Sequence, residues 1–156
     1  MTTSNGAEPF GFAYDDRAQL IVSEAMSGAL SSYRVNRSGD LTTVNASIPD
    51  GGTAPCWVVI TRGSAHDIAF TSNTDSNTVS SYAVGEHGRL TLLQSVAANT
   101  GTGPIDEALS ANSNFLYVSE SGSQQIQVFN INSDGTLNLL QTVSGLPAGA
   151  DGLAAN

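Results

Sequence analysis

The sequence contains no lysine, one cysteine and few aromatic residues, and it has no long apolar run. Five arginines against fourteen carboxylates give a formal net charge of -9, which excludes nucleic acid as a partner on electrostatic grounds. A lone cysteine, Cys56, excludes an internal disulfide and a thiolate metal cluster. With no transmembrane run and a polar N-terminus that does not resemble a signal peptide, we expect no membrane contact and a cytoplasmic location by default.

What the sequence does contain is a repeat, present three times at a spacing of 47 to 49 residues. In each copy an apolar residue stands three positions before an aromatic residue and eleven before a leucine. These triplets are Leu30, Tyr33 and Leu41, then Val79, Tyr82 and Leu90, then Ile126, Phe129 and Leu137. A period of this length is typical of propellers and solenoids, whose units bury their faces only against neighbouring units.

Within each copy, short apolar runs separated by Gly, Pro, Asn and Ser predict four β-strands. The expected strands are about 10–15, 19–24, 29–35 and 41–47, then 57–62, 66–72, 78–84 and 90–97, then 105–110, 114–119, 125–131 and 137–143. A glycine in the last turn of each copy, at Gly39, Gly88 and Gly135, supplies the positive φ that a hairpin turn needs.

Repeated four-stranded units predict an all-β fold, a β-propeller segment with blades at about 9–54, 55–103 and 104–147. Residues 148–156 align with 104–112, so we expect them to form the innermost strand of a fourth blade. Propellers typically have about 4 to 8 blades, so this segment cannot close a ring alone. The ring is completed either by a second copy, in a homodimer or higher oligomer, or by the missing blades of a longer chain.

The sequence also resembles a known family. The residues that carry the likeness are a proline opening the inner strand, strands ending in Val22-Ser-Glu24 and Val118-Ser-Glu120, and the run Ser31-Ser-Tyr-Arg-Val35 followed by Asn36-x-x-Gly39-x-Leu41. They resemble the lactonase-type propellers, which include 6-phosphogluconolactonase-like proteins and carboxymuconate lactonising enzymes. Members are usually seven-bladed and roughly twice as long. The ending Gly145-Leu-Pro-Ala-Gly-Ala-Asp-Gly-Leu-Ala-Ala155 resembles the C-terminus of such a protein, so we expect the chain to correspond to a C-terminal half. The resemblance implies a hydrolase or lactonising activity on a small lactone.

Chain direction places eight acids on the rim where the inner strands begin, which we call the upper rim, and no arginine among them. They are Glu8, Glu24, Asp50, Asp75, Asp106, Glu107, Glu120 and Asp151. We predict Glu24, Glu120 and Asp106 as catalytic residues, and Trp57, Asn73, Glu107 and Asp151 as substrate-binding residues. Such acids can serve as general acid and base toward a neutral lactone, or hold a divalent cation such as calcium; the alternative is that they are simply solvated.

Other nucleophile and base combinations fail on geometry. His66 and His87 fall in turns of the opposite, lower rim, whereas Cys56 lies at the start of an inner strand on the upper side. A nucleophile needs its base within hydrogen-bond reach. Two functions therefore remain open. One is a half-propeller assembly or binding scaffold without a full catalytic site. The other is a lactonase that acts on a small-molecule ligand through the carboxylates of the upper rim, at the mouth of the propeller channel. Half a ring holds half a site, which favours the scaffold.

Overall fold

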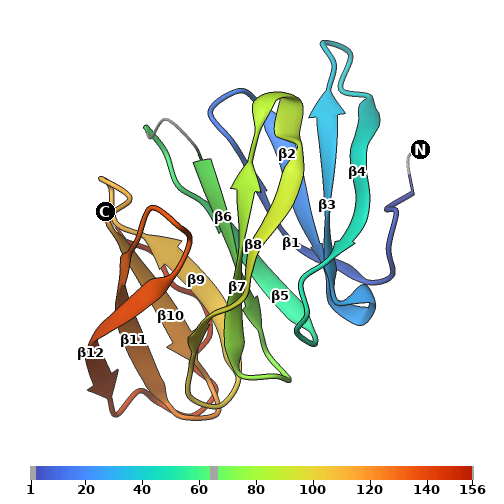
Figure 1. The fold of residues 1–156 in the computed structure, drawn as a ribbon. Helices are drawn as coiled ribbons and strands as arrows, with labels where there is room; N and C mark the ends of the chain where they lie inside the picture. The colour runs from blue at the N-terminus through green and yellow to red at the C-terminus, as the bar shows by residue number, and fades with distance from the viewer. Residues whose placement is uncertain (1–2, 64–66, 156) are drawn as a thin grey trace.

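The computed structural model describes residues 3–63 and 67–155, and this part of the chain forms three antiparallel sheets of four strands each (Figure 1). Each sheet contains one copy of the repeat, and we call the sheets blades 1, 2 and 3. Strands that follow one another along the chain are neighbours within each sheet, so each blade is a meander of hairpins.

The strand boundaries lie within two residues of the expected ones. Blade 1 contains β1 (Pro9–Tyr14), β2 (Gln19–Glu24), β3 (Ala29–Val35) and β4 (Leu41–Pro49); blade 2 contains β5 (Pro55–Ile60), β6 (Asp67–Asn73), β7 (Thr78–Val84) and β8 (Leu90–Asn99); blade 3 contains β9 (Pro104–Leu109), β10 (Phe115–Glu120), β11 (Gln125–Ile131) and β12 (Leu137–Ser144). Two short 3-10 turns, η1 (Ala25–Ser27) and η2 (Glu86–Gly88), complete the element order. No helix in the described ranges is long and apolar enough to cross a membrane.

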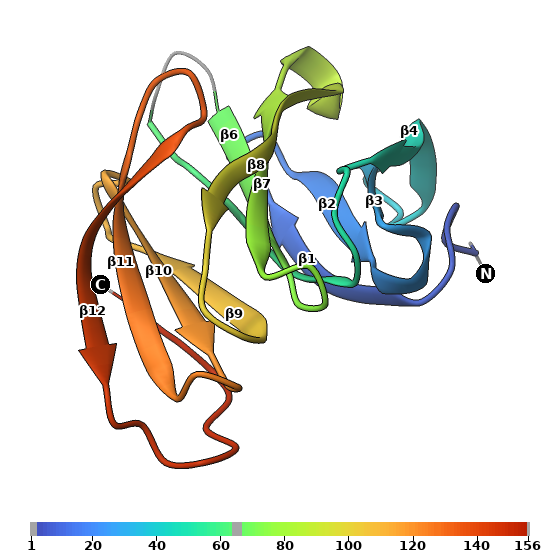
Figure 2. The ribbon, with the colours of Figure 1, turned by 60° about the horizontal axis from the view of Figure 1, so that its bottom comes forward.

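The first strands of the three blades lie side by side. β1 contacts β5, and β5 contacts β9, so these inner strands follow one another around a common axis (Figure 2). The last strands β4, β8 and β12 lie at the opposite, outer edges of the sheets. The prediction of an all-β partial propeller is confirmed.

Two apolar cores hold the blades together, one at each boundary. Between blades 1 and 2 the core includes Ile21, Leu30, Val58, Ile60 and Tyr82. Between blades 2 and 3 it includes Phe70, Val79, Leu116, Val118 and Phe129. A blade in the middle of the array therefore buries both faces, as the apolar pattern on both sides of its strands requires.

The outer faces of blades 1 and 3 have no neighbouring blade. Phe12 and Tyr14 of β1 are 62 % and 46 % exposed, whereas Val58 and Ile60, at the same positions of β5, are buried. On blade 3, Tyr117 and Ile126 are half-buried. Their counterparts in the first two blades are fully buried: Ile21 and Leu30, then Phe70 and Val79. Both ends of the array thus present the surfaces that its interior uses as interfaces.

The N-terminal segment covers one part of the open face of blade 1. Inside the array, the Tyr82 hydroxyl donates a hydrogen bond to the Ile48 carbonyl of the preceding blade, 3.0 Å away. The equivalent Tyr33 hydroxyl has no preceding blade and instead accepts the Asn5 N–H at 3.0 Å. The segment before β1 therefore takes the place of an outer strand at this point.

Residues 148–155 differ from the expected inner strand, since none of them is in a β-strand. The segment lies beside β9, where the Leu153 N–H donates to the Asp106 carboxylate at 2.6 Å. Gly149 and Gly152 have φ values of 73° and 92°, which interrupt an extended conformation. An inner strand also needs an antiparallel partner, and the described chain contains no further strands of that blade.

Candidate functional site at the mouth of the channel

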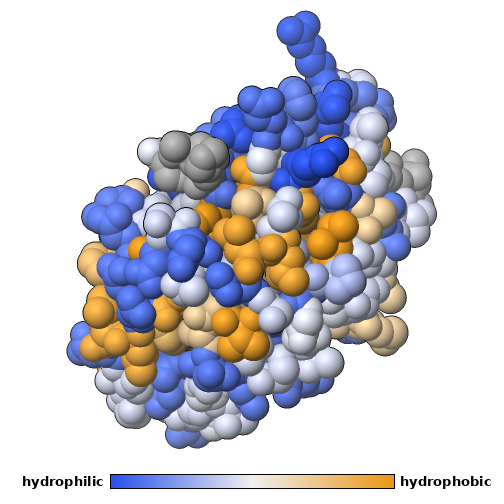
Figure 3. Space-filling view, viewed as in Figure 1, coloured by the Kyte–Doolittle hydropathy of each residue, from blue (hydrophilic) through white to orange (hydrophobic). Residues whose placement is uncertain are grey.

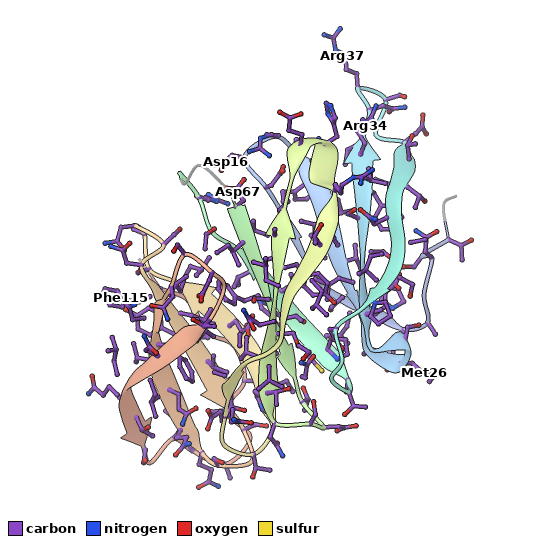
Figure 4. The ribbon with its side chains drawn as sticks, in the orientation of Figure 1. Asp16, Met26, Arg34, Arg37, Asp67 and Phe115 are labelled. Carbon is purple, nitrogen blue, oxygen red and sulfur yellow. The ribbon has the colours of Figure 1, made fainter. Side chains whose placement is uncertain are left out.

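The two rims are separated as chain direction predicted. Asp16, Arg37 and Asp67 lie at one end of the sheets and Met26 lies at the other (Figure 4). Arg17 forms ion pairs at the lower rim with Asp67, at 3.6 Å, and with Asp15, at 3.9 Å. The inner strands begin at the upper rim, which is the end where the predicted site lies.

Most of the eight upper-rim acids are buried rather than solvated. Five are nearly inaccessible to solvent: Glu24, Asp50, Asp106, Glu107 and Glu120. The other three, Glu8, Asp75 and Asp151, are exposed. Burial of this many carboxyl groups on one rim requires hydrogen bonds or protonation, because an unpaired buried charge is costly.

A pocket of about 240 Å3 opens where the inner strands begin. It is lined by Phe10, Trp57, Ile105, Asp106, Asp151 and Gly152. The structure thus brings together one predicted catalytic residue, Asp106, and two predicted substrate-binding residues, Trp57 and Asp151. Sequence reasoning missed Phe10 and Ile105, although both directly follow the proline that opens their strand.

Asp106 is held in a fixed orientation by two backbone donors. The Glu107 N–H donates to Oδ1 at 2.7 Å, and the Leu153 N–H donates to Oδ2 at 2.6 Å. Burial raises the pKa of this carboxyl group, the two N–H groups lower the pKa in part, and the Asp151 carboxylate raises it again. A carboxyl group with a raised pKa at a pocket wall has the properties of a general acid.

Glu107 follows Asp106 along β9, so its side chain leaves the strand on the opposite face. Only 2 % of the residue is exposed, and neither carboxyl oxygen has a hydrogen-bond partner among the described residues. Burial, and secondarily the neighbouring Asp106, raises the pKa of Glu107 well above its ordinary value. Glu107 therefore keeps its proton to a higher pH than a solvated glutamate does.

Glu24 has a different environment from Asp106. Its Oε1 accepts hydrogen bonds from the Ser4 hydroxyl and the Gly6 N–H, both at 2.7 Å, and its Oε2 accepts one from the Ser47 hydroxyl at 2.9 Å. All of these partners belong to blade 1 or to the segment that precedes it. The side chain is fully buried, so it ties the connection before β1 to the end of β2 and does not face the pocket.

The equivalent residues of the other blades repeat this arrangement. Glu120 accepts a hydrogen bond from the Gln125 side chain at 2.5 Å; burial raises its pKa, and hydrogen bonds from Gln125 and the Gly101 backbone lower it in part. Asn73 donates to the Ser80 hydroxyl at 2.7 Å and lies against Gly52. Predicted site residues Glu24, Asn73 and Glu120 thus each connect strands of their own blade, and the structure does not bring them to the mouth pocket with Asp106.

A glycine makes this connection possible in every blade. Gly6, Gly52 and Gly101 stand three residues before the strand-opening prolines Pro9, Pro55 and Pro104. A Cβ at any of these glycines would overlap the side chain of the paired Glu or Asn. The Gly-x-x-Pro spacing was the sequence signal for a structural role of these acids.

His87 and Cys56, which the sequence argued against as catalytic groups, do not line the mouth pocket. His87 is exposed in η2, and His66 lies outside the described residues. Cys56 is buried at the start of β5. Within residues 3–63 and 67–155, no three His, Cys, Asp or Glu side chains form a group that could hold a metal ion.

Comparison with known proteins assigns the family. The family model of the lactonases, described as a seven-bladed β-propeller, matches residues 2–108. The chain belongs to this lactonase family. The resemblance inferred from the repeat is therefore confirmed, while its placement in a C-terminal half stays a prediction. A search of curated proteins found no match.

Solved structures show the same fold in longer chains. A putative 6-phosphogluconolactonase from Bacteroides uniformis has 18 % identity and a TM-score of 0.77, with 91 % of this chain and 42 % of that chain covered. The periplasmic gluconolactonase of Pseudomonas aeruginosa has 20 % identity and a TM-score of 0.71, with 97 % of this chain and 43 % of that chain covered. A protein from Lactobacillus plantarum has 24 % identity and a TM-score of 0.74, with 87 % of this chain and 41 % of that chain covered. The lactonase segment thus spans less than half the length of these structures.

Proposed function

We propose that this lactonase segment is a ring-completing scaffold, which packs its two open faces against further propeller blades and carries part of a ligand site at the channel mouth. The observation that carries the proposal is the contrast between equivalent positions. Phe12 is exposed and Tyr117 is half-buried, while the residues at the same positions of blade 2, Val58 and Phe70, are buried between blades. Blades of the same kind, from a second copy or from further sequence, are the surfaces that fit these faces.

Light scattering at micromolar concentration tests this proposal with the isolated chain. We expect a ring-completing homo-oligomer, and we expect the double variant Phe12→Asp/Tyr117→Asp to abolish that contact, because a carboxylate in an apolar interface is left unpaired. Met26→Asp is the matched control, since Met26 is 75 % exposed on the upper rim, outside both faces. A wild-type chain that stays at its monomer mass of 16.0 kDa would exclude a second copy as the source of the missing blades.

The alternative function is hydrolysis of a small neutral lactone at the mouth pocket. It is favoured by the raised pKa of Asp106 beside Trp57 and by family membership. Arg17 and Arg62 form ion pairs with acids of the lower rim, so neither guanidinium group is at this pocket to bind the phosphate of a phosphorylated substrate. Because a general acid typically contributes about 10²–10⁴-fold, we expect Asp106→Asn to lower kcat/KM on glucono-lactone by at least that lower limit.

The exposed Asp75→Asn serves as the control in this assay, and each protein is measured with and without chelator. Equal rates for Asp106→Asn and the parent would remove the carboxylate mechanism. A rate lost only with chelator would instead indicate a bound divalent cation such as calcium.

A further inference from the structure

The outer strands of blades 2 and 3 carry a stripe of exposed large apolar side chains. The stripe consists of Leu92, Leu93 and Val96 on β8 and Leu139, Leu140 and Val143 on β12, which are between 37 % and 57 % exposed. Figure 3 shows apolar surface over both of these strands. Exposed apolar surface that gathers on one side of a protein in this way is typical of an interaction site.

The stripe follows a sequence pattern that blade 1 lacks. β8 and β12 share Leu-x-Leu-Leu-Gln-x-Val, whereas β4 has Thr43, Val44 and Ser47 at the corresponding positions. The apolar character is therefore a property of two outer strands and not of the repeat as a whole.

The open blade faces do not account for this stripe. Blade 2 has a blade on each side, and its residues Leu92, Leu93 and Val96 are nevertheless exposed. Packing further blades on the ends of the array would leave them exposed as well. Completion of the ring thus does not explain the exposed apolar side chains of the outer strands.

β12 offers a free strand edge in addition to its side chains. It pairs with β11 alone, so its other edge carries backbone N–H and C=O groups without a strand partner. Edge strands are normally protected by lysine, proline or other charged residues. From Leu137 to Ser144 the strand contains none of these, its only irregularity is a bulge near Leu140, and all residues after Leu137 are exposed.

β8 is the less accessible of the two edges. The Gln94 side chain donates a hydrogen bond to the Asp134 carbonyl, and Gly135 lies against Leu93. The turn between β11 and β12 therefore packs against β8 and covers part of it. β12 is the edge with room for another strand.

We propose that β12 pairs in antiparallel orientation with β12 of a second copy, about a two-fold axis, and joins two blades into one eight-stranded sheet. An added strand hydrogen-bonds to the free backbone groups along the whole edge, which a helix or a loop of a partner protein does not do. If β12 pairs with β12 of a second copy, leucine and valine side chains of the two strands lie beside one another. The chain has a net charge of -9, but β12 itself has no charged residue, so the paired strands do not repel each other. Such a contact uses the same patch on both copies, so each edge is satisfied by one partner.

Light scattering on two double variants separates this contact from ring completion. Phe12→Asp/Tyr117→Asp removes the open-face contact and should leave a dimer of twice the 16.0 kDa chain mass. Leu139→Lys/Leu140→Lys, added to the Phe12→Asp/Tyr117→Asp variant, should remove the edge contact, because lysine blocks edge pairing. We expect the dissociation constant of the dimer to rise at least about tenfold. Thr42→Lys/Ala46→Lys, which adds the same charge to exposed positions of β4, should leave the dimer intact.

A peptide probe tests the strand pairing directly. A peptide with the sequence Leu137–Ser144 should compete with the edge dimer, whereas the same peptide with N-methyl groups on alternate backbone nitrogens should not. Equal competition by both peptides, or an edge dimer unaffected by the lysine variant, would overturn the proposal. Failure of the open-face variant to change the mass would count against ring completion alone.

Discussion

Replacing Gly11 by alanine is expected to lower the free energy of unfolding by about 3 kcal/mol, near the upper end of what overpacking costs. A Cβ at Gly11 would lie 2.6 Å from the Cys56 carbonyl oxygen and 2.9 Å from the Trp57 Cα. Both atoms belong to the backbone of β5, which cannot move aside as a flexible side chain can. The substitution therefore has to push two inner strands apart.

The same position connects the blades by hydrogen bonds. The Gly11 N–H donates to the Ser23 hydroxyl at 2.9 Å, and that hydroxyl lies 3.0 Å from the Cys56 carbonyl, to which it donates. Separating β1 from β5 would strain the second bond as well, since it crosses from blade 1 to blade 2.

Thermal unfolding at one fixed protein concentration measures the effect, because association changes the apparent stability. For a chain of this size, 3 kcal/mol corresponds to a fall in Tm of roughly 6 to 12 °C. Gly85→Ala is the control, since Gly85 has a φ of -81° and a Cβ there meets no atom closer than 3.5 Å. A Gly11→Ala protein that melts within about 1 °C of this control would contradict the close approach of the two strands.

The strands were predictable from the sequence because the repeat fixes both their length and their turns. Gly39, Gly88 and Gly135 all have positive φ, as the hairpin prediction required. The C-terminal segment was not predictable from its alignment with 104–112. Alignment shows which side chains correspond, but a strand also needs a neighbouring strand to pair with. The described residues contain no second strand of a fourth blade with which this segment could pair.

Of the candidate site, the sequence predicted the rim on which it lies, and its function stays a prediction. Chain direction placed Asp106, Trp57 and Asp151 on the upper rim, and they line one pocket. It could not distinguish these residues from Glu24 and Glu120, which end a strand on the same rim. Glu24 and Glu120 are hydrogen-bonded to groups of their own blade or of the segment before it, whereas Asp106 lines the pocket. Only the folded chain shows this difference in surroundings.

Replacing Glu107 by valine is expected to raise the free energy of unfolding by about 1–3 kcal/mol at pH 7, the cost of leaving a buried polar group unpartnered. The two equivalent positions are apolar, Phe12 in β1 and Val58 in β5, so the surroundings of β9 are built for an apolar side chain. A glutamate kept there against this pattern is a candidate functional group, and lactone hydrolysis should be measured alongside stability.

The pH dependence identifies the cause of this gain. Because burial raises the pKa of Glu107, the folded protein holds a proton that the unfolded chain releases above its ordinary pKa of about 4.3. Glu107 therefore destabilises the fold progressively as the pH rises from about 4.3 toward the raised pKa. The difference between Glu107→Val and the parent should be smaller at pH 4 than at pH 7, with Glu107→Gln intermediate at pH 7 because it removes the ionisation but keeps an unpartnered polar group. A gain that is the same at both pH values would mean that packing, and not the buried carboxyl group, sets the stability of this boundary.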